Sequence, residues 1–203
     1  MELNTIRCCD CLDGMREIPD KSIDLVITDP PYGINGFGDR IDKSFKINDW
    51  DNKPSKEYFD ELFRISKNQI IFGGNYFELP PTPCFLIWDK EQTKMFSFAM
   101  CEYIWTSFKS PAQIFRYRSV GSHIVKTHPT EKPLPLFEWI IKNYAKEGDV
   151  ICDPFFGSGS CLVACVRMGH PFIGFEKEQS YFDAAQIRIK KAQEQGKLMG
   201  TWF

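Results

Sequence analysis

Apolar residues along the chain fall into short runs that alternate with amphipathic stretches. Eight of these runs have the length and composition of β-strands, and several end in loops rich in glycine, proline or aspartate. The predicted strands are Thr5–Cys9, Ile23–Thr28, Gln69–Phe72, Phe85–Trp88, Tyr103–Phe108, Gln113–Tyr117, Val150–Cys152 and Phe172–Phe175.

Helical periodicity appears between several of these strands. In one stretch Tyr58, Leu62 and Ile65 share a face, as in an amphipathic helix. Residues 33–54 and 121–133 are polar or glycine-rich and predict long loops, which in compact domains usually contact a ligand or a partner. The alternation predicts an α/β fold, and 203 residues fit a single domain over residues 1–203. The predicted helices are Ser55–Ser66, Pro135–Ala145, Ser160–Met168 and Ser180–Glu194.

Composition places the chain among folded, soluble proteins, since 43% of its residues are hydrophobic and 26% are charged. No apolar run approaches the roughly 18 residues of a membrane span, and the first residues do not resemble a signal peptide, so we expect a cytoplasmic protein without a membrane partner. The pair Cys8 and Cys11 has the spacing of zinc ligands. It lacks a second pair, and we predict reduced thiols and no metal site.

Charge is distributed unevenly, although the net charge is only −2. Residues 1–89 carry ten basic and sixteen acidic side chains, residues 90–132 carry seven and three, and residues 133–203 carry eight of each. Phosphate binding needs only local positive potential, so a small basic segment at about 90–125 is a candidate DNA-contacting surface, although a solvated surface would explain the excess as well. The candidate residues are Lys90, Lys94, Lys109, Arg116, Arg118 and Lys126.

The tetrapeptide Asp29-Pro30-Pro31-Tyr32 follows an apolar strand directly. Two prolines fix the backbone there and hold the Asp29 carboxylate and the Pro30 carbonyl beside the ring of Tyr32. Open parallel sheets bind ligands at the carboxyl ends of their strands, so this acceptor pair is suited to a planar amine such as a nucleobase. Taken alone, the tetrapeptide is also compatible with a rigid turn.

A glycine loop after the strand near residue 150 is a second candidate ligand-binding segment. Gly157 and Gly159 allow a ligand to approach the backbone, and the helix that follows would favour a ligand carboxylate at its amino end. Leu162 stands where a dinucleotide motif would have its third glycine, which argues against nicotinamide. Glu176 ends the next predicted strand, where a carboxylate commonly accepts hydrogen bonds from a ribose.

These motifs together resemble the amino-group (adenine-N6 or cytosine-N4) DNA methyltransferases, in the motif order of their beta group. The supporting segments are Asp29-Pro30-Pro31-Tyr32, Phe155-Phe156-Gly157-Ser158-Gly159, Arg7 to Leu12, Phe72-Gly73-Gly74-Asn75 and His128-Pro129-Thr130-Glu131-Lys132-Pro133. The resemblance implies a Rossmann-like fold for S-adenosylmethionine-dependent methyltransferases, with a mixed, mostly parallel sheet flanked by helices and a circularly permuted motif order.

The resemblance also implies roles for individual residues. Asp29, Pro30, Pro31 and Tyr32 would be catalytic, and S-adenosylmethionine would be the cofactor. Asp10 would bind the cofactor's adenine amine, and Glu176 would bind its ribose. The residues expected around the methionine part are Phe155, Gly157, Gly159, Asp153, Thr130 and Lys132.

The expected activity is transfer of a methyl group to a flipped adenine in DNA, as in restriction-modification enzymes. Aspartate at position 29 favours adenine N6, because relatives acting on cytosine N4 more often carry serine there. Cytosine N4, an inactive DNA-binding relative, and an RNA or protein-amide methyltransferase remain alternatives. Only about 35 residues are available for target recognition before residue 128. We therefore expect either a short or relaxed recognition sequence, or further contacts supplied by a homodimer or another partner.

Overall fold

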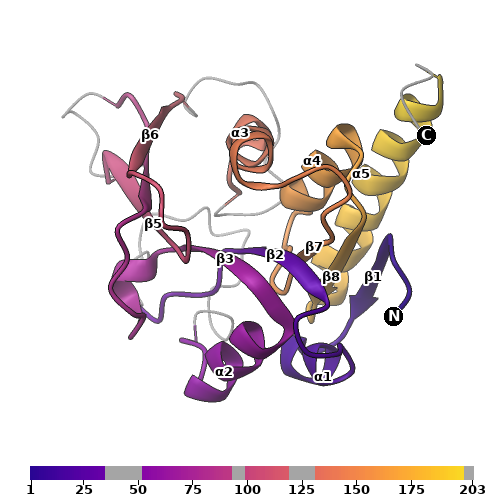
Figure 1. Cartoon of the computed structure of the whole chain (residues 1–203). Coiled ribbons are helices and arrows are strands. Elements are labelled where there is room, and N and C mark those ends of the chain that lie inside the picture. Colours follow the sequence, from indigo (N-terminus) through magenta and orange to yellow (C-terminus); the bar gives the residue numbers. More distant parts are fainter. Residues whose placement is uncertain (35–51, 93–98, 119–130, 199–203) are drawn as a thin grey trace.

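The computed structural model describes residues 1–34, 52–92, 99–118 and 131–198 (Figure 1). Eight strands in these ranges form one sheet in the order β1-β8-β7-β2-β3-β5-β4-β6. The first five strands of that order are mutually parallel. They are β1 (Thr5–Cys8), β8 (Phe172–Glu176), β7 (Ile151–Asp153), β2 (Ile23–Thr28) and β3 (Ser66–Phe72).

The remaining strands give the sheet its mixed character. β5 (Cys101–Thr106) pairs antiparallel with both β3 and β4 (Phe85–Asp89), whereas β6 (Gln113–Arg116) is parallel to β4. Among the described strands, β5 alone therefore runs against the others. Its amino end lies at the edge where the other strands have their carboxyl ends. The predicted α/β fold with a mixed, mostly parallel sheet is confirmed.

Helices cover both faces of the sheet (Figure 1). α3 (Leu134–Tyr144), α4 (Ser160–Met168) and α5 (Gln179–Leu198) lie on one face, and α1 (Cys11–Arg16) and α2 (Lys56–Ile65) lie on the other. Strand side chains alternate between the faces, so Leu25 packs with the α3–α5 layer and the neighbouring Val26 packs with the α1–α2 layer. Burial on both faces explains the continuous apolar runs in the sequence.

The structure contains all eight predicted strands and all four predicted helices, with shifted ends. β3 begins at Ser66, β7 ends at Asp153, and α5 is 20 residues long. Two short elements were missed, α1 and the 3₁₀ helix η1 (Gly74–Tyr76). The six residues of α1 are too few for a periodic pattern, and its start depends on Asp10, whose carboxylate accepts a 2.8 Å hydrogen bond from the Leu12 amide.

Some sequence predictions cannot be compared with the structure. Most of the two predicted long loops lie outside the described residues, as do the expected DNA contacts Lys94 and Lys126 and the expected cofactor residue Thr130. Within the described ranges, no helix is long and apolar enough to cross a membrane. The same ranges contain no group of three histidine, cysteine or acidic residues arranged to hold a metal ion.

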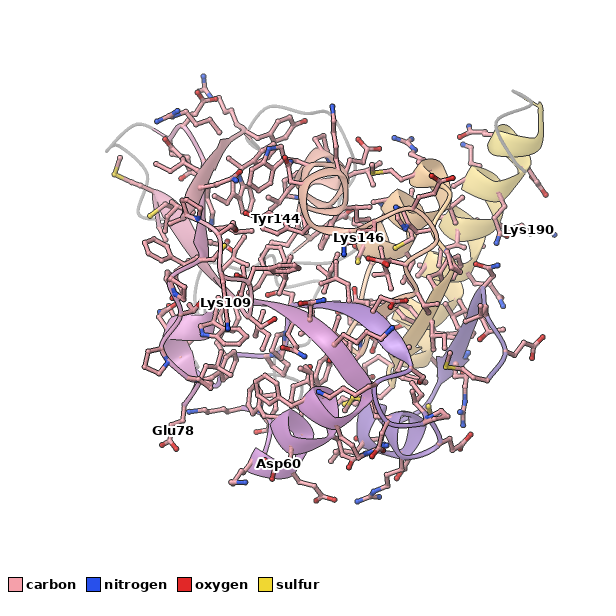
Figure 2. All side chains as sticks on the ribbon, in the orientation of Figure 1. Asp60, Glu78, Lys109, Tyr144, Lys146 and Lys190 are labelled. Atoms are coloured by element: carbon pink, nitrogen blue, oxygen red, sulfur yellow. The ribbon has the colours of Figure 1, made fainter. Side chains whose placement is uncertain are left out.

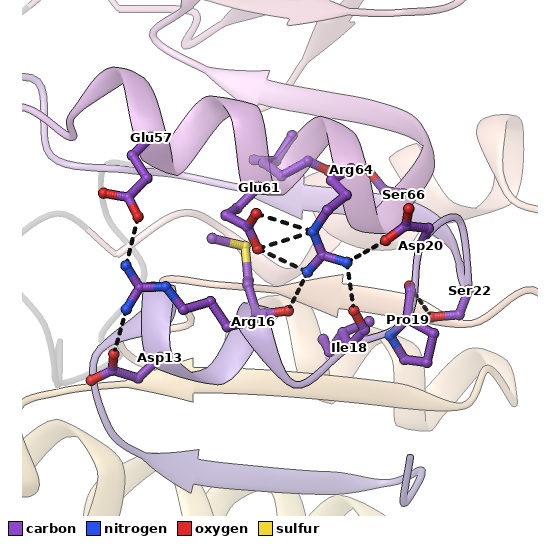
Figure 3. Close-up of polar contacts among 12 residues, drawn as sticks. Asp13, Arg16, Ile18, Pro19, Asp20, Ser22, Glu57, Glu61, Arg64 and Ser66 are labelled. Carbon is purple, nitrogen blue, oxygen red and sulfur yellow. Dashed lines mark hydrogen bonds and ion pairs between the residues drawn. The ribbon is translucent and has the colours of Figure 1, made fainter.

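Arg64, in the last turn of α2, fastens the connection between α1 and β2 (Figure 3). Its guanidinium donates to the carbonyls of Met15 and Ile18, both at 2.9 Å, and to Asp20 Oδ1 at 2.6 Å. It also donates to the carboxylate of Glu61 at 2.8 to 3.1 Å. The side chain is 28% exposed, so these bonds are partly shielded from water. Arg64 thereby holds in place the segment that leads into β2.

We predict that Arg64→Met destabilises the fold by about 1.5–3 kcal/mol, because buried carbonyls lose a charged donor. Urea unfolding monitored by circular dichroism measures this change. Arg16→Met is the matched control. Arg16 pairs with Asp13 and Glu57 on the open surface (Figure 3), where water screens such pairs and they contribute little to stability. Equal losses in the two variants would contradict this role of Arg64.

Candidate active site

Four acidic residues lie at the carboxyl ends of adjacent parallel strands. Asp153 and Glu176 end β7 and β8, whereas Asp29 and Asp10 follow β2 and β1. These strands are neighbours in the order β1-β8-β7-β2, so the four acids share one edge of the sheet. The fold therefore brings the tetrapeptide and the glycine loop together, although more than a hundred residues separate them in the sequence.

The carboxylate of Asp29 is held by two donors. The Tyr32 hydroxyl donates to Oδ1 at 2.6 Å, and the Lys132 ammonium donates to Oδ2 at 2.6 Å. Burial, followed by the charge of Asp29, raises the pKa of Tyr32 well above its ordinary value, so this phenol stays protonated. Lys132 was expected beside the cofactor's methionine part, and the structure places it against Asp29.

Tyr32 sits in an aromatic group with a glycine at its edge. Its ring stacks on Tyr76 at 4.9 Å with an interplanar angle of 19°, and Phe77 meets it edge-on at 6.2 Å. Gly73, which follows β3, has φ +64°, and a Cβ there would lie 2.3 Å from Tyr32 Cε1. Both the backbone angle and the lack of a side chain are therefore needed to seat Tyr32.

The glycine loop is fastened to the end of β8 by Glu176. The Gly157 amide donates to Glu176 Oε2 at 3.1 Å, and the Glu178 amide donates to Oε1 at 2.8 Å. Glu176 is buried, and this burial raises the pKa of its carboxyl group. Each carboxylate oxygen still has a second lone pair, so this anchoring role is compatible with the expected bond to a ribose hydroxyl.

Gly159 is needed for the packing of α5 against the glycine loop. Its φ is +78°, and a Cβ there would lie 2.9 Å from the Cβ of Ala185 in α5. Its missing side chain therefore lets α5 approach the loop, a contact that the sequence did not reveal. Phe155, the other expected cofactor contact in this segment, places its ring 5.2 Å from that of Tyr58 in the α1–α2 layer.

Asp153 is the most perturbed acid at this edge. Burial raises its pKa to about 8, and the nearby charges of Asp29 and Glu176 act in the same direction. The amide of Phe155 donates to Asp153 Oδ1 at 3.1 Å and opposes that shift. Near pH 7 the Asp153 carboxyl group is therefore mostly protonated, and it adds little negative charge beside Asp29.

This shift predicts a pH-dependent stability. Between the ordinary pKa of 3.8 and the folded value of about 8, the folded protein holds a proton that the unfolded chain releases. Asp153 thus favours folding at low pH, and its contribution falls by about 1.4 kcal/mol per pH unit as the pH rises through this window. Denaturant unfolding across pH 5–8 should show this slope in the wild type and not in Asp153→Asn. Parallel curves for the two proteins would contradict it.

Glu131 and Lys132 are neighbours that reach different parts of the site. The Ser160 hydroxyl, at the start of α4, donates to Glu131 Oε1 at 3.1 Å, and Arg188 of α5 pairs with the same carboxylate at 2.8 Å. Arg188 also donates to the Ser158 carbonyl at 2.8 Å. Glu131 therefore joins the glycine loop while Lys132 joins Asp29. The resemblance placed the Thr130–Lys132 stretch, and with it Glu131, at the methionine end of the cofactor, but nothing in the sequence indicated the role of Arg188.

The structure places the basic residues of the segment at about 90–125 in different surroundings. The Lys90 side chain is only 14% exposed and pairs with Glu102 at 2.7 Å, which argues against a phosphate contact in this conformation. Lys109, labelled in Figure 2, is exposed. It follows the carboxyl end of the antiparallel β5, which puts it at the opposite edge of the sheet from Asp29. Arg116 and Arg118 are exposed beside the carboxyl end of β4.

Comparison with known proteins bears on the family and the fold. A family model described as DNA methylase matches residues 82–187, just over half of the chain. YubD of Escherichia coli (strain K12), which is named as a methylase, is 27% identical over 220 aligned positions that cover 96% of this chain and 95% of YubD.

Two solved structures share the fold. The M1.HpyAVI–SAM complex has a TM-score of 0.62 at 21% identity, covering 91% of this chain and 98% of its own. The PvuII DNA methyltransferase (cytosine-N4-specific) has a TM-score of 0.65 at 16% identity, covering 96% and 91%. The fold is thus that of S-adenosylmethionine-dependent DNA methyltransferases. Because the family model matches more than half of this chain, the chain belongs to the amino-group DNA methylase family, whose members take their methyl group from S-adenosylmethionine.

Proposed function

We propose that the chain transfers the methyl group of S-adenosylmethionine to the exocyclic N6 amine of adenine in DNA. The observation that carries the proposal is the position of Asp29. Its carboxylate follows β2, one strand away from the glycine loop that follows β7. A methyl acceptor bound at Asp29 would therefore face a methyl donor bound at that loop.

The residues at the β1, β8 and β7 ends fit this cofactor. Carboxylates at Asp10 and Glu176 can accept hydrogen bonds from an adenine amine and a ribose hydroxyl, as the family pattern implies. The first turn of α4 has no side-chain cap from Gly159, so its amides can bind a carboxylate. The bound cofactor supplies an electrophilic methyl group on a positively charged sulfur.

The catalytic residues act on the amine by hydrogen bonding. An exocyclic amine is a poor nucleophile because its lone pair is delocalised into the ring. By accepting the two amine hydrogens, Asp29 and the Pro30 carbonyl favour a pyramidal nitrogen whose lone pair points at the methyl group. In direct in-line transfer the new N–C bond would form as the C–S bond breaks and leaves a neutral thioether. The methylated nitrogen would then lose one proton, through the carboxylate of Asp29 that accepts its hydrogen bond, to solvent. This route needs only positioning and electrostatic stabilisation, without a covalent intermediate.

The target base must leave the DNA duplex to reach Asp29. Flipping costs roughly a few kcal/mol, and stacking on an aromatic ring offsets part of that cost. Tyr32 is the ring beside Asp29, and Tyr76 supports it by stacking. Arg116 and Arg118 are the described basic residues that we assign to DNA phosphates, because both are exposed near the same edge of the sheet.

Cytosine N4 is the second candidate acceptor. Its amine would offer the same two hydrogens to Asp29 and Pro30, and a structure of similar fold is the cytosine-N4-specific PvuII methyltransferase. Aspartate rather than serine at position 29 favours adenine, through the resemblance to the adenine-specific members. Asp29 as a carboxylate also disfavours a protein-amide substrate, for which relatives carry asparagine in this position.

Transfer of labelled methyl groups tests the proposal. The protein is incubated with labelled S-adenosylmethionine and duplex DNA, RNA or a protein mixture, and the modified nucleoside or residue is identified by mass spectrometry. We expect N6-methyladenine in DNA. N4-methylcytosine in DNA would establish cytosine as the acceptor instead. Label in RNA or protein would show that DNA is not the substrate. The absence of label in every substrate would indicate an inactive DNA-binding relative. Light scattering separately tests the proposed homodimer.

A further inference from the structure

Four charged side chains, none more than 21% exposed, form a chain that begins at Asp29 of the tetrapeptide. Lys132 Nζ lies 2.6 Å from Asp29 Oδ2 and 3.4 Å from Glu102 Oε2. Glu102 Oε1 in turn pairs with Lys90 Nζ at 2.7 Å. Acid and base therefore alternate from the end of β2, through the segment before α3, to the start of β5 and the end of β4.

Burial makes this arrangement demanding for Lys132. Its side chain is 6% exposed, and its ammonium lies 5.8 Å from the ring centre of Tyr32 and 5.6 Å from that of Phe72. Burial alone would lower the pKa of Lys132, but the charges of Asp29 and Glu102 outweigh it and raise the pKa. A buried ammonium of this kind needs carboxylate partners in every state of the site.

The two carboxylates hold Lys132 unequally. Asp29 Oδ2 accepts a short hydrogen bond, whereas Glu102 Oε2 is fully buried and accepts no hydrogen bond from the residues that the structure describes. The separation of 3.4 Å between Lys132 Nζ and Glu102 Oε2 is an ion-pair contact at the long end of hydrogen bonding. A small displacement of the ammonium would satisfy this oxygen and release a lone pair on Asp29.

We infer that Lys132 is a positioning residue for Asp29, with Glu102 as the second carboxylate that receives its ammonium when the target amine binds. This inference rests on the proposed function, since the amine is the group that would take over the released lone pair. Before the base arrives, the ammonium of Lys132 holds the Asp29 carboxylate in position. Afterwards Glu102 keeps Lys132 paired, so that no uncompensated charge is left in the buried site.

The charges that face Lys132 give the inference a test that needs no substrate. The carboxylates of Asp29 and Glu102 both face its ammonium, and Lys90 lies on the other side of Glu102. Because these two negative charges raise the pKa of Lys132 against its burial, removing either of them, in Asp29→Asn or Glu102→Gln, should lower the pKa of Lys132. The fall should be larger in Asp29→Asn, because that carboxylate is the nearer partner.

Nitrogen-15 NMR of side-chain-labelled lysine measures the pKa of Lys132 in the full-length protein without substrate, with its signal assigned from Lys132→Arg. We expect the pKa of Lys132 to be lower than in the wild type in both Asp29→Asn and Glu102→Gln. Lys146→Met, at an exposed lysine (Figure 2), should leave the titration of Lys132 unchanged. An unchanged pKa of Lys132 in Glu102→Gln would overturn the inference.

Kinetics supply the second readout. Lys132→Met should lower kcat at neutral pH by about 10- to 100-fold. Glu102→Gln should raise the KM for DNA more than it lowers kcat, because the ammonium then competes with the base for Asp29. Cofactor binding, measured by calorimetry, should be unchanged in both variants.

The two readouts separate failure of the inference from failure of the proposed function. A wild-type protein that methylates no substrate would contradict the proposed function, whereas the NMR titration needs no substrate and tests the charge chain in either case. If Lys132→Met does not fold, the titration of Lys132 in Glu102→Gln still decides the outcome.

Discussion

Asp29→Asn should lower the rate of methyl transfer by about 100- to 1,000-fold while the protein still binds S-adenosylmethionine. The asparagine keeps the shape of the side chain but loses the charge that Lys132 and Tyr32 now stabilise at 2.6 Å each. Removing one preorganised group that stabilises a transition state typically costs this much, about 2.7–4 kcal/mol. Single-turnover transfer of a labelled methyl group to DNA measures the rate, and calorimetry measures cofactor binding.

Asp60→Asn is the control for that substitution. Asp60 lies on the exposed side of α2 (Figure 2) and pairs with Lys56 one helical turn away, so losing its charge should leave both transfer and cofactor binding unchanged. Glu102 still partners Lys132 when Asp29 is neutral, which should limit the loss of stability in Asp29→Asn. Wild-type transfer rates in Asp29→Asn would show that another group holds the amine.

Gly73→Ala should lower transfer by about 100-fold, because the added methyl group displaces Tyr32. A Cβ at this position would lie 2.3 Å from the ring, so the ring must move away from its position beside Asp29. A displacement of about 1 Å in a positioning group can reduce a rate by this factor. The KM for DNA should rise as well, since Tyr32 is the proposed stacking surface for the base. Steady-state kinetics with duplex DNA measure both quantities.

Gly148→Ala separates this clash from backbone strain. Gly148 also has positive φ, +80°, but a Cβ there would have nothing within 4 Å. Both alanine variants should therefore lose about 1–2 kcal/mol of stability from a left-handed residue, Gly73→Ala should lose further stability through the clash, and only Gly73→Ala should lose activity. Matched activity losses in the two variants would refute the role assigned to the Gly73–Tyr32 contact.

Much of the fold follows from local patterns. The apolar runs at Ile23–Thr28 and Phe172–Glu176 identified strands because both of their faces are buried, and helix α4 begins and ends where its sequence predicted. Short elements escaped prediction for the opposite reason. The six residues of α1 depend on the cap at Asp10, and the three of η1 follow the left-handed Gly73, so neither displays a period.

The distribution of charge on the surface could not be predicted from the order of charged residues in the sequence. Residues 90–132 form a basic segment in the sequence, but the antiparallel direction of β5 places Lys109 at one edge of the sheet and Glu102 at the other. Lys90 and Lys132 are then used to neutralise Glu102 and Asp29 inside the protein. A net charge counted along the sequence therefore overstated the positive surface available to DNA.

The sequence by itself determined the α/β alternation, the rigid Asp29-Pro30-Pro31-Tyr32 segment at the end of a strand, and the glycine loop, because each depends on backbone rules that act within a few residues. Only the tertiary structure decided which side chains meet across the sheet. Lys132 reaches Asp29 over 103 positions of the chain, and Glu102 joins them because one strand is reversed. Strand order and direction are set by the packing of the whole sheet, and no local pattern of hydrophobic and polar residues encodes them.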